Sequence, residues 1–320
     1  SVGAMEGMMR LGRSRFGLVS MVLGAVLFLE VSLRGYGFGK PLLYEVAAYG
    51  YRVKPNQDLR RFGNHLYYNE LGMRSGPIKR GADSVHLRVL CLGDSITFGG
   101  VQTDQTRTYP ELLKSKLGPE RYEVLNVSAG GWAPENEWGW LRQNGLFGSK
   151  LLLLEIGTND LMQPMSSGDV VDEHPSFPGH NPPLATGELI YRYLLPRLGL
   201  LETVDPGAQV GAGTPVQVLA NLNTVRDIVN FARANGAEVA LLRIEEPAFM
   251  KDAAAFASAS RQLDELAAAM HVQVIKPDAA LKKAGYANVF RGDMVHPNAA
   301  GNEVIADVVG DALKAVLPGR

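Results

Sequence analysis

The chain has 320 residues, of which 46% are hydrophobic and 20% charged, and this balance excludes a disordered or collagen-like protein. Its 32 basic and 33 acidic residues give a net charge of −1, so nothing predicts the positive field that a nucleic-acid partner would need. The single cysteine, Cys91, excludes an intrachain disulfide framework and a cysteine-rich zinc site.

The N-terminus combines basic residues with an apolar run. Three arginines between positions 10 and 15 precede residues 16–29, in which Ser20 is the only polar side chain. This order is typical of a signal peptide or an uncleaved signal anchor. No small-x-small cleavage site follows, which favours an anchor over residues 1–33. The positive-inside rule then places the rest of the chain outside the cytoplasm, in a periplasm or at the cell surface.

Residues 34–85 form a lead-in segment that is rich in tyrosine and has no long helical period. Glycines and a proline interrupt it at short intervals. This pattern predicts short strands and turns that form a flap on the main domain.

Residues 86–320 show the pattern of one α/β domain. Short apolar runs, typical of buried parallel strands, occupy residues 86–92, 122–127, 150–156, 237–244 and 272–275. Helical spacing separates them at residues 109–117, 135–147, 216–234 and 258–270, and a last helix starts near Asn298. Strands that alternate with helices at these lengths predict a three-layer, flavodoxin-like, doubly wound parallel sheet of about five strands, with helices on both faces.

One long segment interrupts this alternation. Residues 161–214 are rich in proline and glycine and include an apolar helix candidate at residues 189–201. A stretch this long inside an α/β domain is usually functional. We expect it to lie near the carboxyl ends of the strands, where open α/β sheets bind their ligands.

The first strand leads into Gly93-Asp94-Ser95-Ile96-Thr97. A small residue before a serine at a strand-to-helix turn lets the backbone bend sharply and exposes the hydroxyl group at the sheet edge. Thr97 stands where the nucleophile elbow of α/β hydrolases has its second glycine, so that motif is excluded. No Gly-Lys-Ser/Thr follows, which excludes a phosphate-binding loop.

A carboxylate and a histidine lie three residues apart near the C-terminus, as Asp293 and His296. A carboxylate bonded to one ring nitrogen fixes the tautomer and leaves the other nitrogen free to take a proton. Pro297 keeps His296 out of the last helix. On its own, an aspartate three residues before a histidine more often forms a surface hydrogen bond than part of an active site.

Acyl transfer also needs hydrogen-bond donors for an oxyanion, and two loops after strands offer them. Residues 126–132 contain Gly130 and Gly131, which allow close approach of a backbone N–H. Residues 157–160 present the amide of Asn159. Either loop alone is more simply an ordinary strand-to-helix turn.

Taken in order, the four blocks resemble the SGNH (GDSL-type) hydrolase superfamily over residues 86–318. Residues 69–74 (NELGMR) also resemble the lead-in of membrane-anchored bacterial members. The resemblance implies Ser95 as the nucleophile, Asp293 as the acid and His296 as the base. It implies an oxyanion hole made by the backbone N–H groups of Ser95 and Gly131 and the side chain of Asn159. Ser128 departs from the family, in which many members have glycine there.

The function that follows is a serine esterase that uses an acyl-enzyme and neither a metal nor an organic cofactor. The resemblance allows acetylated carbohydrates, lipids and thioesters, and an extracytoplasmic anchored form favours short acyl groups on a glycan. Two alternatives stay open. An O-acetyltransferase would pass the acyl group to a sugar and would need a membrane partner that delivers acyl groups, and a glycan-binding protein would keep the fold without turnover.

Two residues of these blocks raise separate questions. Trp132 follows the glycine loop, and we expect it to line the pocket and stack on a sugar, whereas Trp138 and Trp140 are expected to pack in a helix. Glu155 interrupts the apolar third strand, and the sequence pattern does not account for it.

Overall fold

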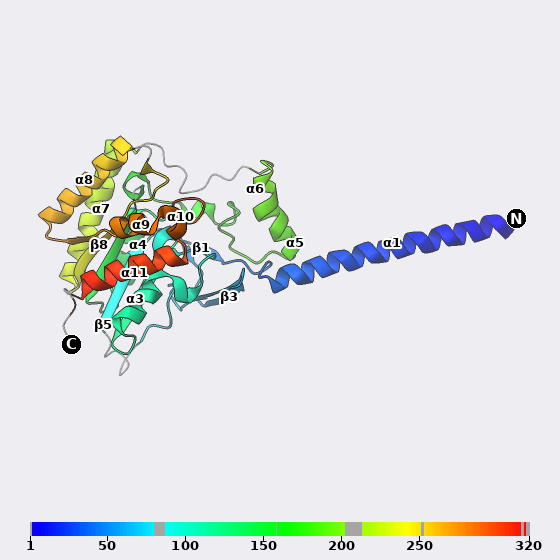
Figure 1. Cartoon of the computed structure of the whole chain (residues 1–320), viewed down its shortest axis with the longest axis horizontal. Coiled ribbons are helices and arrows are strands. Elements are labelled where there is room, and N and C mark those ends of the chain that lie inside the picture. Colours follow the sequence, from blue (N-terminus) through cyan, green and yellow to red (C-terminus); the bar gives the residue numbers. More distant parts are fainter. Residues whose placement is uncertain are drawn as a thin grey trace.

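The computed structural model describes residues 2–79, 87–157, 159–201, 213–250, 253–314 and 317. His86, the first residue of the expected catalytic domain, lies outside this part of the chain. The domain carries at one corner a long helix, α1 (Val2–Gly35), that extends away from it (Figure 1).

The centre of the domain is a parallel sheet with the strand order β6-β5-β7-β8-β9. Its strands are β5 (Leu87–Gly93), β6 (Tyr122–Ser128), β7 (Leu151–Gly157), β8 (Glu238–Ile244) and β9 (Gln273–Ile275). All residues of β6 and β7 are buried, which is why these strands appear in the sequence as continuous apolar runs. The predicted doubly wound α/β fold is confirmed.

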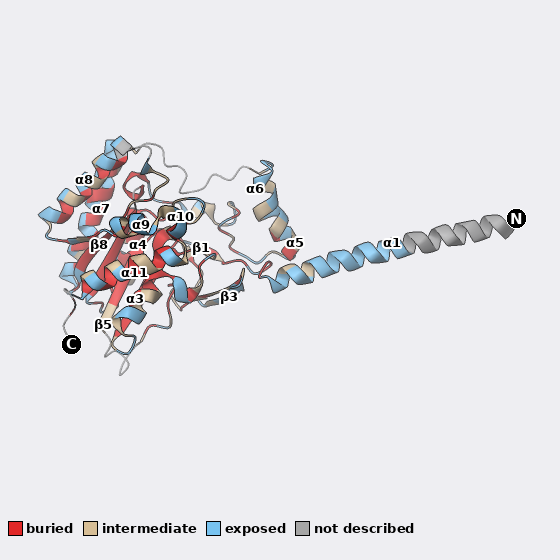
Figure 2. Cartoon of the chain, viewed as in Figure 1, coloured by how far each residue is buried: buried red, intermediate tan, exposed pale blue. Residues whose placement is uncertain are grey.

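Helices cover both faces of the sheet (Figures 1 and 2). One face packs against α4 (Pro134–Asn144), α7 (Pro215–Ala234) and α8 (Ala253–Ala269). The other packs against α3 (Tyr109–Leu117), α9 (Asp278–Ala284), α10 (Tyr286–Val289) and α11 (Ala299–Leu313). Alternation along β5 divides the core, since Leu90 and Leu92 point to the first layer and Val89 and Cys91 to the second.

Two antiparallel hairpins form the flap. They are β1 (Tyr44–Ala47) with β2 (Gly50–Val53) and β3 (Gln57–Arg61) with β4 (Asn64–Tyr68). The buried guanidinium group of Arg74 ties the end of the flap to the loop after β5, because it donates to the carbonyls of Phe98 at 2.6 Å, Gly100 at 2.7 Å and Thr103 at 2.6 Å. The flap therefore lies against the carboxyl edge of the sheet.

The insertion between β7 and α7 begins with the 3₁₀ turns η3 (Asp160–Met162) and η4 (Gly168–Val170). It continues as one short rod made of α5 (Ala185–Glu188), the π-helical η5 (Leu189–Leu194) and α6 (Leu195–Arg197). The helix predicted at residues 189–201 is thus present, but it ends at Arg197. Residues 202–212 of the insertion lie outside the described part of the chain.

A buried ion pair joins the flap to this rod. The guanidinium group of Arg61 lies 2.7 Å from Glu188 Oε1, and both side chains are almost fully buried. Arg61 also stacks over the ring of Phe62, 4.7 Å from its centroid. The other carboxylate oxygen of Glu188 accepts the backbone N–H of Gly39 at 2.6 Å. One carboxylate thus holds the start of the flap, its second hairpin and the insertion together.

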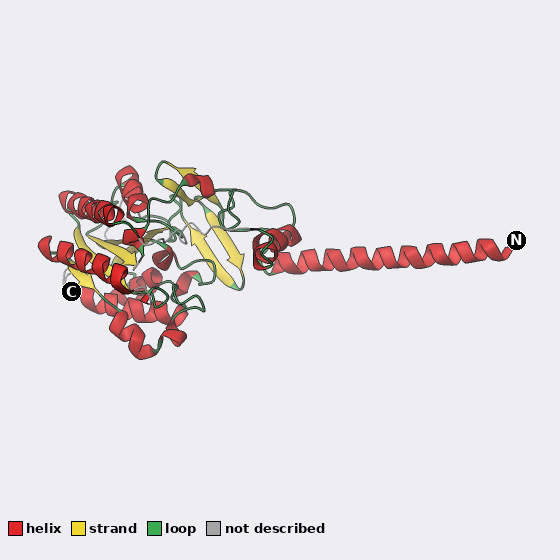
Figure 3. Cartoon of the chain, turned by 90° about the horizontal axis from the view of Figure 1, so that it is seen from above, coloured by secondary structure: helices red, strands yellow, loops and turns green. Residues whose placement is uncertain are grey.

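Helix α1 contains residues Gly17–Gly35, a stretch long and apolar enough to cross a membrane. Its exposed side chains from Leu18 to Val31 pack against no other part of the described domain, and the views along two directions show the helix projecting from it (Figures 1 and 3). A core helix is buried on at least one side. The segment has instead the features of a signal sequence or a membrane anchor.

Replacing Glu188 by alanine should destabilise the fold strongly, because it leaves the buried charge of Arg61 without its partner. We expect a loss of about 3 to 5 kcal/mol in the free energy of unfolding, measured by urea denaturation. The control is Asp311→Ala, which breaks an exposed pair with Lys314 and should leave stability almost unchanged. Equal effects of the two substitutions would contradict a structural role for the buried pair.

Candidate active site

Ser95 lies at the point where β5 turns into α2 (Ser95–Phe98). The turn is tight, because a Cβ atom on Gly93 would lie 2.3 Å from Thr97 Oγ1 and 2.7 Å from Glu155 Oε2. Asp94 caps the short helix, with Oδ1 accepting the N–H of Ile96 at 2.8 Å. The hydroxyl group of Ser95 is consequently presented at the carboxyl edge of the sheet, as the sequence predicts.

Asp293 and His296 occupy a turn just before α11. Asp293 Oδ1 accepts the backbone N–H groups of Val295 and His296, both at 2.9 Å, and Oδ2 lies 2.9 Å from His296 Nδ1. Met294 adopts the left-handed conformation, with φ of 57°, which reverses the chain between them. The expected contact between carboxylate and ring is present.

A hydrogen bond joins this turn to the serine, since His296 Nε2 lies 3.1 Å from Ser95 Oγ. The turn is held in place by Arg291, which donates to the carbonyl of Gly99 and to Thr103 Oγ1, both at 2.6 Å. Ser95, His296 and Asp293 thus form a continuous chain of contacts. Such a chain allows the ring to take the hydroxyl proton of the serine.

The charge state of Asp293 fits this arrangement. Partial burial raises the pKa of Asp293, but hydrogen bonds from the backbone and ring of His296 and from the backbone of Val295 outweigh it, so the net pKa is lower than usual. The carboxylate is therefore ionised at neutral pH. It accepts the proton on Nδ1, and Nε2 is left as an acceptor toward Ser95.

The three expected oxyanion donors lie on neighbouring strands. Gly131 follows β6, Ser95 follows β5 and Asn159 follows β7, and these strands are adjacent in the sheet. Gly131 has φ of 77°, in the region that favours glycine. The structure thus places the two loops on either side of Ser95, while the role of Gly131 and Asn159 as donors stays a prediction.

Both loops are braced by residues outside the sequence blocks. Tyr51 of the flap donates its hydroxyl proton to the carbonyl of Gly130 at 2.5 Å, and Ser166 of the insertion donates to the carbonyl of Gly131. The amide of Asn221 on α7 donates to three carbonyls of the loop after β7, those of Asp160, Leu161 and Gln163, at 2.8 to 3.1 Å. Sequence spacing gave no signal for these supports.

Trp132 belongs to the core and does not line a pocket. Its ring is 2% exposed, and its Nε1 donates to the carbonyl of Tyr51 at 3.0 Å. The expectation that it lines the pocket and stacks on a sugar is therefore wrong. The ring fills the space between the first hairpin of the flap and the glycine loop, which is a packing role that sequence alone could not distinguish.

Glu155, which interrupts the apolar strand β7, belongs to a group of three buried carboxyl groups beneath Ser95. Ligand atoms of Asp94, Glu155 and Asp160 all lie within 4.8 Å of one another. Glu155 Oε2 accepts from Thr97 Oγ1 at 3.0 Å and from the N–H of Asp94 at 3.4 Å. Burial, together with the nearby carboxylate of Asp94, raises the pKa of Glu155 and of Asp160 well above the usual range.

Asp94 also contacts Ser95, since its Oδ2 lies 3.1 Å from Ser95 Oγ. The serine hydroxyl therefore has two acceptors at the same distance, Asp94 Oδ2 and His296 Nε2, and one proton to share between them. The sequence signal for the group of Asp94, Glu155 and Asp160 was the charged residue Glu155 inside the apolar strand β7, because a buried carboxyl group is tolerated only with specific partners.

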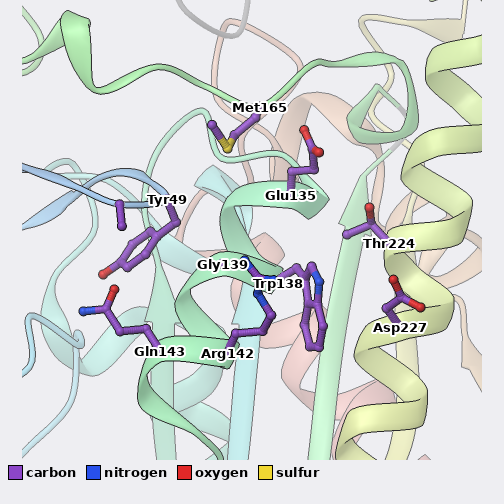
Figure 4. A pocket seen from close by; sticks show the side chains of 10 residues that line it. Tyr49, Glu135, Trp138, Gly139, Arg142, Gln143, Met165, Thr224 and Asp227 are labelled. Carbon is purple, nitrogen blue, oxygen red and sulfur yellow. The ribbon is translucent and has the colours of Figure 1, made fainter.

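A cavity of about 690 Å³ opens along α4, between the flap and α7 (Figure 4). Aromatic and charged side chains line it, namely Tyr49, Glu135, Trp138, Arg142 and Asp227, with Ala48, Gly139, Gln143, Met165 and Thr224. A second cavity, of about 280 Å³, lies in the proline-rich part of the insertion. Neither is lined by Ser95, Asp293 or His296, and Glu135 is four residues beyond Gly131.

The chain is similar to three solved structures at less than 25% identity and with TM-scores below 0.5. A GDSL-like lipase from Bacteroides thetaiotaomicron is 14% identical, with 75% of this chain and 93% of that chain covered and a TM-score of 0.45. The esterase EstA from Pseudoalteromonas is 18% identical, with 72% and 97% covered and a TM-score of 0.44. A catalytic mutant of an acetylxylan esterase from Geobacillus stearothermophilus is 16% identical, with 76% and 100% covered and a TM-score of 0.45. At these values the likeness says nothing about substrate.

No curated protein matches the chain. The GDSL-like Lipase/Acylhydrolase family model, in contrast, matches residues 91–304. The matched region contains Ser95, Gly131, Asn159, Asp293 and His296, whereas α1 and the flap precede it. The match covers well over half of the sequence and includes every block on which the resemblance rests. The chain therefore belongs to the GDSL-like lipase/acylhydrolase family.

Proposed function

We propose that this acylhydrolase is an extracytoplasmic serine esterase that cleaves short acyl esters on a glycan. The observation that carries the catalytic part is the chain of contacts from Asp293 through His296 to Ser95, at 2.9 and 3.1 Å. Family membership supports ester hydrolysis as the reaction. The roles of the individual residues and the nature of the substrate are our proposal.

Ser95 Oγ attacks the ester carbonyl while its proton passes to His296 Nε2. The carbonyl oxygen becomes an oxyanion, and collapse of the intermediate expels the alcohol, which takes the proton back from His296. The acyl group then remains on Ser95 as an ester. Water repeats the sequence, releasing the acid and restoring the serine. Asp293 stays ionised throughout and stabilises the imidazolium form of the ring.

Three donors are proposed to stabilise the oxyanion. As the first residue of α2, Ser95 has a backbone N–H with no partner inside the helix. The N–H of Gly131 and the side-chain amide of Asn159 reach the same edge from the two flanking strands. Donors held rigidly act mainly on the transition state, where charge is concentrated on the oxygen.

The proposed substrate rests on location and on the polarity of the nearby surface. The apolar helix α1 supports an anchored protein with its catalytic domain outside the cytoplasm, on the side where cell-surface glycans are accessible to it. The cavity along α4 offers Trp138 beside charged residues, a lining that suits a sugar better than a long acyl chain. A panel of aryl esters from acetyl to palmitoyl, assayed beside acetylated oligosaccharides, tests the proposal. Preference for long chains would contradict it, and acyl transfer to an added glycan in place of water would assign the protein to acyl transfer.

Ser95→Ala should reduce turnover of an acetyl ester by several orders of magnitude without changing the melting temperature, because members of a triad act as a unit. The same substitution should abolish labelling by a fluorophosphonate probe. Ser115→Ala on the exposed side of α3 is the control and should behave as wild type. Undiminished turnover in the Ser95 variant would remove the nucleophile from the proposal.

Asn159→Ala should lower kcat by about 10² to 10³ and leave KM and the melting temperature nearly unchanged. The matched variant is Asn221→Ala, which removes the amide that holds three carbonyls of the same loop. It should lower the melting temperature because buried carbonyls lose their donor. If Asn159→Ala lost stability and kept kcat, the residue would belong to the support of the loop and not to the oxyanion hole.

Glu155→Gln should flatten the dependence of stability on pH. Because the folded protein raises the pKa of Glu155, it retains a proton that the unfolded chain releases above the usual carboxyl pKa of about 4.3. Unfolding free energy should therefore be highest below this pH and decline as the pH rises toward the raised pKa. Glutamine removes one titrating group and keeps a donor toward Asp94. The measurement is the melting temperature from pH 4 to 8 for both proteins, and identical slopes would count against a protonated Glu155.

A further inference from the structure

The rod formed by α5, η5 and α6 has an apolar face that no other described part of the chain covers. Ile190, Tyr191 and Leu194 are each 46% exposed, and Leu198 is 60% exposed. Positions 190, 194 and 198 recur every four residues, so the side chains share one side of the rod. We call Ile190, Leu194 and Leu198 the outer face. Tyr191, beside it, also lines the smaller cavity. Leu184 and Leu200, 53% and 69% exposed, extend the outer face at both ends.

The opposite side of the rod is fixed to the flap. Tyr193 packs edge-on against Phe38 and Phe62, with ring centroids 5.5 and 6.1 Å apart. The buried pair of Arg61 and Glu188 lies on the same side. Since these contacts hold the inner side firmly, the outer face has a defined direction, away from the flap.

The start of the rod is bonded to the end of α1. The carboxylate of Glu30 accepts the backbone N–H groups of Ala185 at 2.8 Å and Thr186 at 2.9 Å, so it caps α5 from another helix. Arg34 donates to the carbonyl of Pro183 at 2.9 Å and to Glu30 at 2.8 Å. The apolar helix and the insertion therefore keep a fixed relation to each other.

This relation places the rod at the level of a bilayer surface. Arg15 and Arg34 bracket 18 residues, 16–33, which as a helix are about 27 Å long, slightly less than the hydrocarbon core of roughly 30 Å. If α1 spans the bilayer, Glu30 lies one turn inside its outer boundary, and the start of α5, which is bonded to Glu30, lies at the border between the hydrocarbon core and the lipid headgroups. The rod runs across the axis of α1, and hence along the membrane plane (Figure 1).

The composition of residues 184–201 fits an interface between water and lipid. Their only acidic residue is Glu188, which is buried against Arg61, while Arg197 is exposed. Tyr191 beside the outer face and Tyr36, 58% exposed after the end of α1, are of the residue type that gathers at headgroup level. Leucine, isoleucine, tyrosine and arginine without a free acid are typical of a helix that lies in an anionic membrane surface.

We propose that the rod is a second membrane contact, with its outer face seated in the headgroup region of the phospholipid bilayer that α1 crosses. This inference rests on the anchoring part of the proposed function. The outer face and α1 together would then fix the tilt and the height of the catalytic domain relative to the membrane, because a single spanning helix leaves its tilt free and a second contact beside it does not.

Fluorescence quenching in vesicles tests the contact on the full chain. Cys91 is wholly buried, so a cysteine introduced at the surface can be labelled selectively with an environment-sensitive fluorophore. The labelled proteins Leu198→Cys, Val22→Cys and Glu238→Cys are reconstituted in vesicles of phosphatidylcholine and phosphatidylglycerol, with or without nitroxide on the acyl chains. Val22 reports on α1, and Glu238 lies at the opposite edge of the sheet.

We expect blue-shifted emission and quenching by the nitroxide at positions 22 and 198, and neither at position 238. Quenching at 22 without quenching at 198 would overturn the second contact and leave the anchor intact. Absence of quenching at 22 would overturn the anchor itself. A blue shift at 198 that the lipid nitroxide does not quench would show that a second copy of the chain covers the face, which also contradicts the proposal.

A charge-insertion variant tests whether the apolar side chains make the contact. Ile190→Asp with Leu194→Asp should abolish quenching of the probe at position 198 and leave quenching at position 22 unchanged. The matched control places the same two charges at exposed apolar positions of α7, as Val216→Asp with Leu219→Asp. In this control, the probe at position 198 should be quenched as strongly as in the protein without the two charges. An unchanged melting temperature confirms that each variant is folded. Persistent quenching in the folded charged variant would refute the outer face as the lipid contact.

Discussion

The lack of a side chain at Gly93 is the constraint on which the site depends. A Cβ atom there would collide with Thr97 and Glu155. Only glycine at this position therefore lets the chain turn from β5 into α2 so close to the buried carboxyl group of Glu155. This close passage puts Ser95 at the first position of the helix, where its hydroxyl reaches His296 and its N–H has no partner within the helix. A larger residue would move the serine away from both flanking loops, and the geometry of the site would be lost.

How far the sequence predicts this structure depends on the range of the interactions. The five strands were predictable because parallel strands buried on both faces are continuous apolar runs, and Ser95, Asp293 and His296 stood in short local motifs. Trp132 was ambiguous because core and pocket tryptophans have the same local pattern, and its partner Tyr51 is 81 residues away. The pairing of Arg61 with Glu188 spans 127 residues, and no local pattern indicates such a contact.

The flap and the insertion hold the loops at the carboxyl edge of the sheet in position. From the flap, Arg74 forms hydrogen bonds with the loop after β5, and Tyr51 forms one with the glycine loop. From the insertion, Ser166 forms a second hydrogen bond with the glycine loop. The insertion is in turn bonded to α1 through Glu30. Thus the elements that hold the site rigid are also those that join it to the apolar helix. The same segments therefore set both the position of the site relative to α1 and the geometry of the loops around Ser95.

The separation of the reacting groups along the chain has a consequence for the order of folding. Ser95 and His296 are 201 residues apart, and Glu30 and Ala185 are 155 apart. Closing loops of this length is entropically unfavourable until the core beneath them has formed, so such contacts come late. In a nascent chain, Ser95 therefore has no contact with His296 until α11 is docked. The contacts on which the proposed hydrolysis depends form only in a domain whose folding is complete.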